Sequence, residues 1–548
     1  MNTSWQYGKD VQTRTKPEEN KIQISKTQTN NTKEEGFFSG VAALTLSSLL
    51  VKALGMFFKI PMNYILGDTG MGYYNAAYTI YTFFYMLSTA GLPTAVTIVV
   101  SEAKEKRKAI LTLSLWLFCA IGVIGTCILW FGGEALANGI GAPPAVTCMY
   151  AVAPTLFFIC IASALRGYYQ GLSRMIPTAV SQLLEAVGKV AVGILCALVA
   201  MRRNQPTPVV AAYAAMGLTV GAAIGMVYLL LCLRQDAAIP SAPPQDVSMR
   251  RLLKRLTAIA IPITISAAVM SLTSMIDAAL IQRLLQQNGM SQEMATTLYG
   301  NYTSLAVPLF NLPPALVYPI AYAIVPMLTR YAGEQKKIGS LTETALRLSI
   351  LIGAPCAMGL TVLAGPILSL LFRADSAALA APLLIRLAPA SLLVCVLAVT
   401  NSVLQSIGKA ALPVFSMAAG SAVKILSTLW LLPSYGITAA PISTFLCYLI
   451  VTAMNLFFVL RCADLSLHLC RTCLCPMLAA GICAATARLT YAGVTAFVPS
   501  KFAVLFSICV AAAVYLLCVR KMGILGAEER ELLPQKPWVQ KLLYPKEK

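Results

Sequence analysis

Lysine side chains occur inside segments of this chain that are otherwise long and apolar. Lys52 and Lys59 lie in the apolar run 37–66, and Lys189 and Lys424 lie in later runs of the same kind. A lysine at the centre of a membrane-spanning helix costs about 2.5–3.5 kcal/mol even on the lenient insertion scale, so such residues mark functional sites. We expect these ammonium groups to bind an anionic substrate inside a membrane.

The two lysines of the first run differ in their expected depth. If the apolar core begins near residue 40, the helical rise places Lys52 about 18 Å and Lys59 about 28 Å into a core about 30 Å thick. Lys52 is then near mid-depth and is predicted to be the central anion ligand. Lys59 is predicted to lie at the rim of the site, with anchoring at the outer interface as the alternative, because a lysine side chain can extend to the polar boundary.

Two acidic residues accompany these lysines. Glu185 precedes Lys189 by four residues, the favourable order for an intrahelical pair, so the two either neutralise each other or line the site. Asp277 has three possible roles: it pairs with Lys52, binds a coupling cation, or lies near the outer interface. Lys424 has no acidic neighbour on its own helix and is therefore the stronger candidate for a free charge.

The second apolar run carries a stripe of tyrosines. Tyr74, Tyr78, Tyr81 and Tyr85 recur at helical spacing and so share one face of a helix. The stripe either packs the helices together or, through residues such as Tyr78, stacks against the rings of a sugar.

The composition predicts that these lysines and tyrosines lie on membrane-spanning helices. Of the 548 residues, 58% are hydrophobic and 12% are charged, and the mean hydropathy is +0.72. Apolar runs of about 20 residues recur along the chain, which is the length that a helix needs to cross a hydrocarbon core. We predict an all-α polytopic membrane protein with about fourteen transmembrane helices.

The helices are expected to form two lobes. Residues 170–189 and 405–424 both begin with Gln, continue through a proline and end at a Lys at the same distance. Repeats in the same orientation predict two six-helix lobes related by a parallel pseudo-two-fold axis, with the substrate between them. The predicted divisions are a disordered cytoplasmic tail at 1–36, an N-lobe at 37–233, a basic cytoplasmic linker at 234–255, a C-lobe at 256–460, two further helices at 461–519, and a cytoplasmic tail at 520–548.

The charge distribution predicts the orientation in a bacterial-type plasma membrane. Most of the 42 Lys and Arg residues fall in the tails and in loops on the same side as the N-terminus. The positive-inside rule therefore places both termini in the cytoplasm. We interpret the net charge of +20 as a consequence of the membrane topology and as a source of attraction to anionic inner-leaflet lipids. The basic residues are spread over separate loops, which argues against nucleic-acid binding.

The chain offers little that predicts an enzyme. It has no HExxH motif, no P-loop and no glycine-rich nucleotide fingerprint, so we expect no cofactor and an ion gradient or membrane potential as the energy source. Most of the 16 cysteines stand singly in apolar runs, where a thiol behaves as a small hydrophobe. One denser group contains residues that bind zinc elsewhere, although its spacing fits no common template: Cys462, His468, Cys470, Cys473 and Cys475.

Three stretches resemble a known family. They are Arg166-Gly-Tyr-Tyr-Gln-Gly-Leu-Ser-Arg-Met-Ile-Pro, Gly70-Met-Gly-Tyr-Tyr-Asn and Gly91-Leu-Pro-Thr-Ala-Val. They are similar to the stage V sporulation protein B family of polysaccharide-biosynthesis membrane proteins, whose superfamily includes the lipid II flippases, the O-antigen flippases and the multidrug exporters of the MATE type. The resemblance covers roughly residues 37–519 and implies a two-lobed flippase for undecaprenyl-pyrophosphate-linked sugars, with a central cationic cavity.

The resemblance also bears on individual residues. Lipid II flippases have a basic residue in the first helix just before a Leu-Gly pair, and Lys52 stands in that place. A second basic residue follows one or two turns later, and Lys59 matches it with a shift of one place. Where those flippases carry acidic residues around the second helix, this chain has Tyr74 and Asn75, which makes Asn75 a further candidate for the cavity.

Two functions follow from these observations. The first is a monomeric flippase for a polyprenyl-diphosphate glycolipid, either a peptidoglycan precursor or another unit of wall or capsule polysaccharide, with a sporulation or a vegetative role. The second is a cation-coupled multidrug or metabolite antiporter of the same fold, which would need acidic residues to exchange cations for its substrate. Interior lysines without matching acids favour the anionic substrate.

Overall fold

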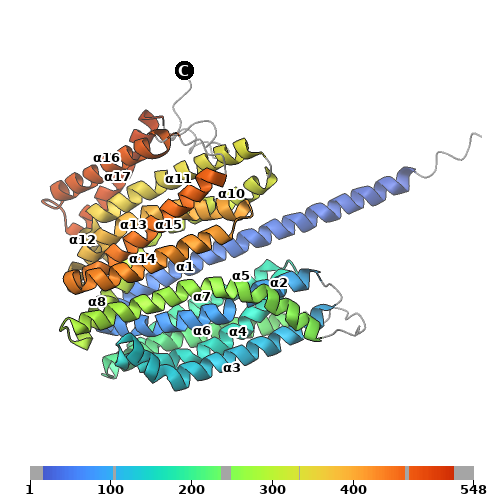
Figure 1. The fold of residues 1–548 in the computed structure, drawn as a ribbon, viewed down its shortest axis with the longest axis horizontal. Helices are drawn as coiled ribbons and strands as arrows, with labels where there is room; N and C mark the ends of the chain where they lie inside the picture. Colours follow the sequence, from blue (N-terminus) through green and yellow to red (C-terminus); the bar gives the residue numbers. More distant parts are fainter. Residues whose placement is uncertain are drawn as a thin grey trace, which may run out of the picture.

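The computed structural model describes a helical bundle (Figure 1). The described residues are 16–102, 106–235, 249–331, 334–462, 468 and 470–523. Among them, ten helices, or eleven if one bent pair counts as a span, are long and apolar enough to cross a membrane. The all-α membrane architecture is confirmed, whereas the number fourteen stays a prediction. Two of the ten helical segments have 53 and 52 residues, and at about 1.5 Å per residue each is long enough to cross a core of about 30 Å twice.

The first six helices lie together on one side of the bundle, in the lower half of Figure 1. They are α1 (Lys16–Thr89), α2 (Leu92–Glu102), α3 (Arg107–Ile140), α4 (Val146–Gly171), α5 (Met175–Arg202) and α6 (Thr207–Gln235). We call them the first lobe. Helix α7 (Met249–Gln287) begins within the predicted basic linker and packs on α1, α2 and α3 as well as on α14. Residues 236–248 of that linker lie outside the described residues.

The later helices form the other side of the bundle. The second lobe consists of α8 (Gln292–Asn301), a π-helix (Tyr302–Ala306), α9 (Val307–Phe310), α10 (Leu312–Arg330), α11 (Gln335–Val362), α12 (Ala364–Leu371), α13 (Ala374–Ser406), α14 (Ala411–Tyr435) and α15 (Ala439–Cys462). Helices α16 (Cys475–Val494) and α17 (Ser500–Lys521) follow and pack on each other, with α16 also against α11.

Helix α1 is longer than the sequence predicts and is broken once. It begins at Lys16, so residues 16–36, which were predicted to be a disordered tail, are helical and extend away from the bundle (Figure 1). A membrane helix supplies the costly nucleus from which further turns can propagate, which accounts for this extension. Residues 1–15 lie outside the described part. The break is at Gly67, whose φ of +67° lies in the left-handed region that glycine adopts without strain.

The eighth apolar run of the sequence, near residues 300–328, carries five prolines, which predict a kinked or broken helix: Pro308, Pro313, Pro314, Pro319 and Pro326. We call α8 to α10 the eighth span, and it is broken. Residues Gln292–Phe310 and Leu312–Val325 are bent by 42° relative to each other, at Asn311. Pro313 and Pro314 follow the bend directly, and they cannot donate the main-chain hydrogen bonds that would continue the helix before them. The π-helix lies just before the bend.

Close helix packing fixes the two helices that carry Lys189 and Lys424. A Cβ added to Gly217 on α6 would come within 2.5 Å of the Lys189 carbonyl oxygen on α5, and one added to Gly221 would come equally close to Glu185. In the second lobe, Gly420 on α14 makes a comparably close contact with α15. Small residues let helix backbones approach in this way inside membranes, so both lysines stand on tightly held helices.

Candidate functional site

Helix α1 presents two lysines to the second lobe. Lys52 and Lys59 are seven residues apart, about two helical turns, and therefore share a face. The Lys59 Nζ donates a hydrogen bond of 2.8 Å to the main-chain carbonyl of Thr303 in the π-helix. The Lys52 Nζ lies 4.9 Å from the centroid of the Tyr318 ring on α10. Both contacts cross from the first lobe to the second.

Lys189 lies against two aromatic rings of α1. Its Nζ is 5.1 Å from the centroid of Tyr78 and 5.6 Å from the centroid of Phe58. An ammonium over an aromatic face is attracted by the ring quadrupole, and more strongly where water is excluded. Phe58, one of these two rings, directly precedes Lys59 in the sequence.

We call Lys52, Lys59 and Lys189 the lysine cluster. Within the described residues, none of these three ammonium groups lies within ion-pair distance of a carboxylate. Their contacts are aromatic faces and one carbonyl oxygen, which stabilise a positive charge without neutralising it. The cluster is therefore a concentration of positive charge that no carboxylate of the described residues pairs with. Lys52 and Lys59 on α1 contact the second lobe, whereas Lys189 on α5 lies against the rings of α1.

Lys424 of the second lobe is neutralised by a carboxylate of α7. The Lys424 Nζ on α14 lies 2.8 Å from Asp277 Oδ2 on α7, and their side chains are only 17% and 10% exposed. The predicted pairing of Asp277 with Lys52 is therefore wrong, and Lys424 is not the free charge that the sequence suggests. The reason is geometric, because α7 packs directly on α14.

Glu185 also has a different partner from the one predicted. Its Oε2 lies 2.7 Å from an Nη of Arg166 on α4, and the Arg166 Nε donates a 2.9 Å hydrogen bond to Ser181 Oγ. Arg166 is buried, so this pair compensates a charge that the first lobe would otherwise bury alone. Lys189 is thus left without the carboxylate four residues before it.

Asn75 and Tyr78 make different kinds of contact. Asn75 is buried, and its amide donates to the Met71 carbonyl and to Ser304 Oγ, so this side chain joins the two lobes. Tyr78 is 36% exposed and stacks on Tyr74 at a centroid distance of 6.1 Å. Of the two, only Tyr78 lies beside the cluster.

Comparison with known proteins identifies the family. A family model described as "Polysaccharide biosynthesis protein" matches residues 37–332, more than half of the chain. The chain belongs to this polysaccharide biosynthesis protein family. The relationship to the sporulation and lipid II flippase proteins expected from the sequence motifs is thereby confirmed, as the following matches show.

Two curated relatives and one solved structure illustrate the relationship. Stage V sporulation protein B of Bacillus subtilis is 26% identical over 451 residues, which are 79% of this chain and 84% of the relative. The lipid II flippase MurJ of the same organism is 24% identical over 523 residues, 89% of this chain and 95% of the relative. A solved structure of the lipid II flippase MurJ in an inward closed conformation shares the fold, with a TM-score of 0.69, 15% identity, and coverage of 87% of this chain and 97% of that one.

Two polar groups of this polysaccharide biosynthesis protein are absent from the sequence-based candidates. Asp68 follows the break at Gly67 and accepts hydrogen bonds from both lobes. A Gly-Asp pair between two apolar runs signals the start of a helix, and this pattern in the sequence could have identified Asp68 as a candidate. Glu343 on α11 is buried and accepts from the Thr472 hydroxyl at 2.8 Å and from the His468 main chain at 3.1 Å.

The cysteine group does not assemble a metal site in the described part of the chain. No set of three His, Cys, Asp or Glu side chains there is placed to share an ion. The His468 ring lies 3.3 Å from the Glu343 carboxylate, and the Cys462 thiol accepts from Lys409 Nζ at 3.2 Å. Cys462 and His468 thus have partners outside the group.

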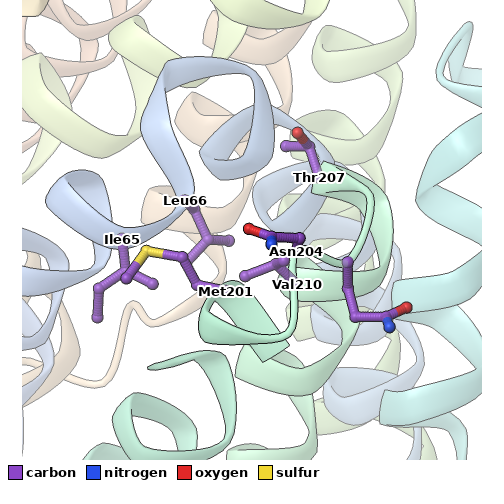
Figure 2. A pocket seen from close by; sticks show the side chains of 7 residues that line it. Ile65, Leu66, Met201, Asn204, Thr207 and Val210 are labelled. Carbon is purple, nitrogen blue, oxygen red and sulfur yellow. The ribbon is translucent and has the colours of Figure 1, made fainter. Parts of the chain in front are cut away.

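A separate pocket lies at the end of the first lobe. It has a volume of about 300 Å³ and lies between the end of the first half of α1 and the turn from α5 to α6 (Figure 2). Figure 2 shows Ile65 and Met201 on one side of it and the Asn204 amide and Thr207 on the other. The pocket lies away from the lysine cluster, and it holds no charged side chain.

Proposed function

We propose that this protein is a membrane flippase that moves a polyprenyl-diphosphate-linked saccharide across the bilayer by alternating access between its lobes. The observation that carries the proposal is the lysine cluster, three ammonium groups that have no carboxylate within ion-pair distance among the described residues, two of which, Lys52 and Lys59, contact the opposite lobe. A diphosphate in a membrane interior needs cationic partners, because burying an unpaired charge is costly. The cluster offers that charge where a ligand between the lobes would reach it.

The contrast between the unpaired lysine cluster and the paired Lys424 supports an anionic substrate over a cationic drug. Asp277 on α7 and Lys424 on α14 compensate each other, so this pair adds no net charge. An exporter of cations would need an uncompensated acid near the substrate path. The relatives named for polysaccharide biosynthesis and lipid II transport fit the same substrate class. The aromatic face of Tyr78, beside Lys189, offers a stacking surface for a sugar ring.

The remaining features of the proposal follow the sequence. We place both termini in the cytoplasm on the positive-inside rule, with basic loops against anionic inner-leaflet lipid. Since no nucleotide motif is present, an ion gradient or the membrane potential drives the cycle. The working unit in this proposal is a monomer, and the saccharide is a unit of peptidoglycan or of another wall or capsule polysaccharide.

The test uses purified protein in proteoliposomes with undecaprenyl-diphosphate-N-acetylglucosamine as the probe. Lys52→Met keeps the length of the side chain and removes its charge, and we expect it to lower the translocation rate at least tenfold. Lys52→Arg keeps the charge and should retain most of the rate, and Lys337→Met, which changes an exposed lysine paired with Glu334, is the matched control. A normal rate for Lys52→Met would contradict the proposal.

A parallel measurement separates the antiporter alternative. Cells that overexpress the chain are loaded with a cationic dye, and efflux is followed after a proton or sodium gradient is imposed. Efflux that depends on Asp277, together with no translocation of the probe, would favour the antiporter.

A further inference from the structure

Polar contacts join the two lobes near the break in α1. The hydroxyls of Thr69 and Thr297 are hydrogen bonded at 2.8 Å, and Asn75 donates to Ser304. In the described residues, the side-chain hydrogen bonds between α1 and the eighth span all end on α8 or on the π-helix, before the bend at Asn311. Beyond the bend, α10 packs instead on α11 and α13. The hydrogen-bonded contact is therefore concentrated at the Gly67 end of the bundle.

Asp68 is the hub of this contact. Its Oδ1 accepts from Asn63 Nδ2 at 3.0 Å and from Ser376 Oγ at 2.6 Å, and its Oδ2 accepts from Asn301 Nδ2 at 3.2 Å. Asn63 belongs to the first lobe, whereas Asn301 on α8 and Ser376 on α13 belong to the second. Hydrogen bonds to a carboxylate are shorter and stronger than those between neutral groups, so one side chain ties α1 to two helices of the opposite lobe.

Glycines let the backbones meet beside this hub. A Cβ on Gly300 would lie 2.6 Å from the Asp68 carbonyl oxygen, and a Cβ on Gly72 would overlap the Thr296 carbonyl. Backbone atoms cannot move aside as flexible side chains can. The lobes can therefore reach this contact only because both positions lack a side chain.

The same contact contains a feature that favours its release. The Oδ1 atoms of Asn63 and Asn301 are buried without a hydrogen-bond partner. A buried oxygen that accepts no hydrogen bond has lost its hydration without compensation, which destabilises the closed contact. Separating the lobes would let water reach these oxygens, which offsets part of the loss of the Asp68 hydrogen bonds.

We propose that Asp68 is a gate residue of the transport cycle. Its carboxylate holds the lobes together at the Gly67 end, and it must release Asn301 and Ser376 before a substrate can pass there. Gly72 and Gly300 form the surface on which the gate closes. The link to transport rests on the proposed flippase function, whereas the closing and opening of the gate do not.

Cysteine cross-linking tests the gate directly. In Thr69→Cys/Thr297→Cys the thiols replace hydroxyls 2.8 Å apart, so an oxidant should join them whenever the gate is closed. We expect rapid cross-linking in proteoliposomes, a loss of at least tenfold in translocation of undecaprenyl-diphosphate-N-acetylglucosamine, and recovery on reduction of the same sample. The unsubstituted chain, with its 16 native cysteines, is oxidised in parallel to give the background.

Two further variants link the gate to its residues. Adding Asp68→Ala to the cysteine pair should slow cross-linking at least threefold, because the hub is lost. Gly72→Ala keeps Asp68 but should also slow it, because the new Cβ meets the Thr296 carbonyl. Asp375→Ala is the matched control, since Asp375 is an exposed acid in the first turn of α13, next to Ser376, and it should leave the rate unchanged.

The outcomes distinguish the gate from the function. Unchanged cross-linking with Asp68→Ala would overturn the role of Asp68, and normal translocation by the cross-linked protein would overturn the gate. Cross-linking is measured without substrate, on protein whose elution as a single species by size exclusion shows that it is folded. Cross-linking that depends on Asp68 in a chain that does not translocate the probe would leave the gate in place and refute the flippase.

Discussion

The buried pair of Asp277 and Lys424 allows a quantitative test of the structure. Asp277→Asn keeps the shape of the side chain and removes its charge, leaving the Lys424 ammonium, which is 17% exposed, without a counter-charge. At 2.8 Å and an effective dielectric constant of about 20, the attraction that is lost is about 6 kcal/mol before solvation is counted. Removal of one partner of a buried pair destabilises proteins by about 3–5 kcal/mol. Because both side chains are slightly exposed, we expect about 3 kcal/mol.

Removing both charges of the pair should restore the free energy of unfolding. Asp277→Leu combined with Lys424→Met removes both charges and fills the space with apolar side chains, which is often neutral for buried pairs. We expect its free energy of unfolding to lie within about 1 kcal/mol of the original. The coupling between the two sites in a double-mutant cycle should then be large.

The assay is equilibrium unfolding of the purified protein in mixed micelles, followed by intrinsic fluorescence. Asp375→Asn, at an exposed position, is the control and should change stability by less than about 0.5 kcal/mol. The reasoning fails if Asp277→Asn is as stable as the original chain. It also fails if the double variant is no more stable than the single one, since the penalty would then not come from an unpaired charge.

Three further predictions concern other parts of the chain. Lys189→Met should weaken equilibrium binding of the diphosphate probe about 10- to 100-fold, because a hydrogen bond to a charged group contributes about 1.5–3 kcal/mol. Lys189→Arg keeps the charge and should retain most of the affinity. If Lys189→Met binds the probe as tightly as the original chain, Lys189 is not a ligand. Gly217→Val should lower the free energy of unfolding by about 1–3 kcal/mol through overpacking against α5, and an unchanged unfolding curve would show that α5 and α6 can separate freely. Glu343→Gln should speed hydrogen–deuterium exchange at residues 470–475, because the charged acceptor for His468 and Thr472 is lost; unaltered exchange would mean that Glu343 does not hold this segment.

The class of the protein and the presence of its unusual charges can be recognised from the order of its amino acids. Helices in a membrane need apolar runs of a fixed length, because the thickness of the hydrocarbon core is fixed. The same constraint makes Lys52 and Lys189 stand out, and it makes the prolines of the eighth span a dependable sign of a break. These are local properties, and each can be recognised within one run of residues.

Which of these charges are compensated depends on contacts between helices that are far apart in the sequence. Lys59 meets Thr303 across 244 residues of sequence, and neither residue indicates the other by type or spacing. Glu185 stands one turn from Lys189, yet it pairs with Arg166, because the packing of α4 and α5 brings that guanidinium closer. Partner choice depends on distances between helices, and helix packing sets those distances through contacts far apart in the chain. The sequence therefore predicts that charges are present in the membrane, whereas the fold decides which of them remain free to bind a substrate.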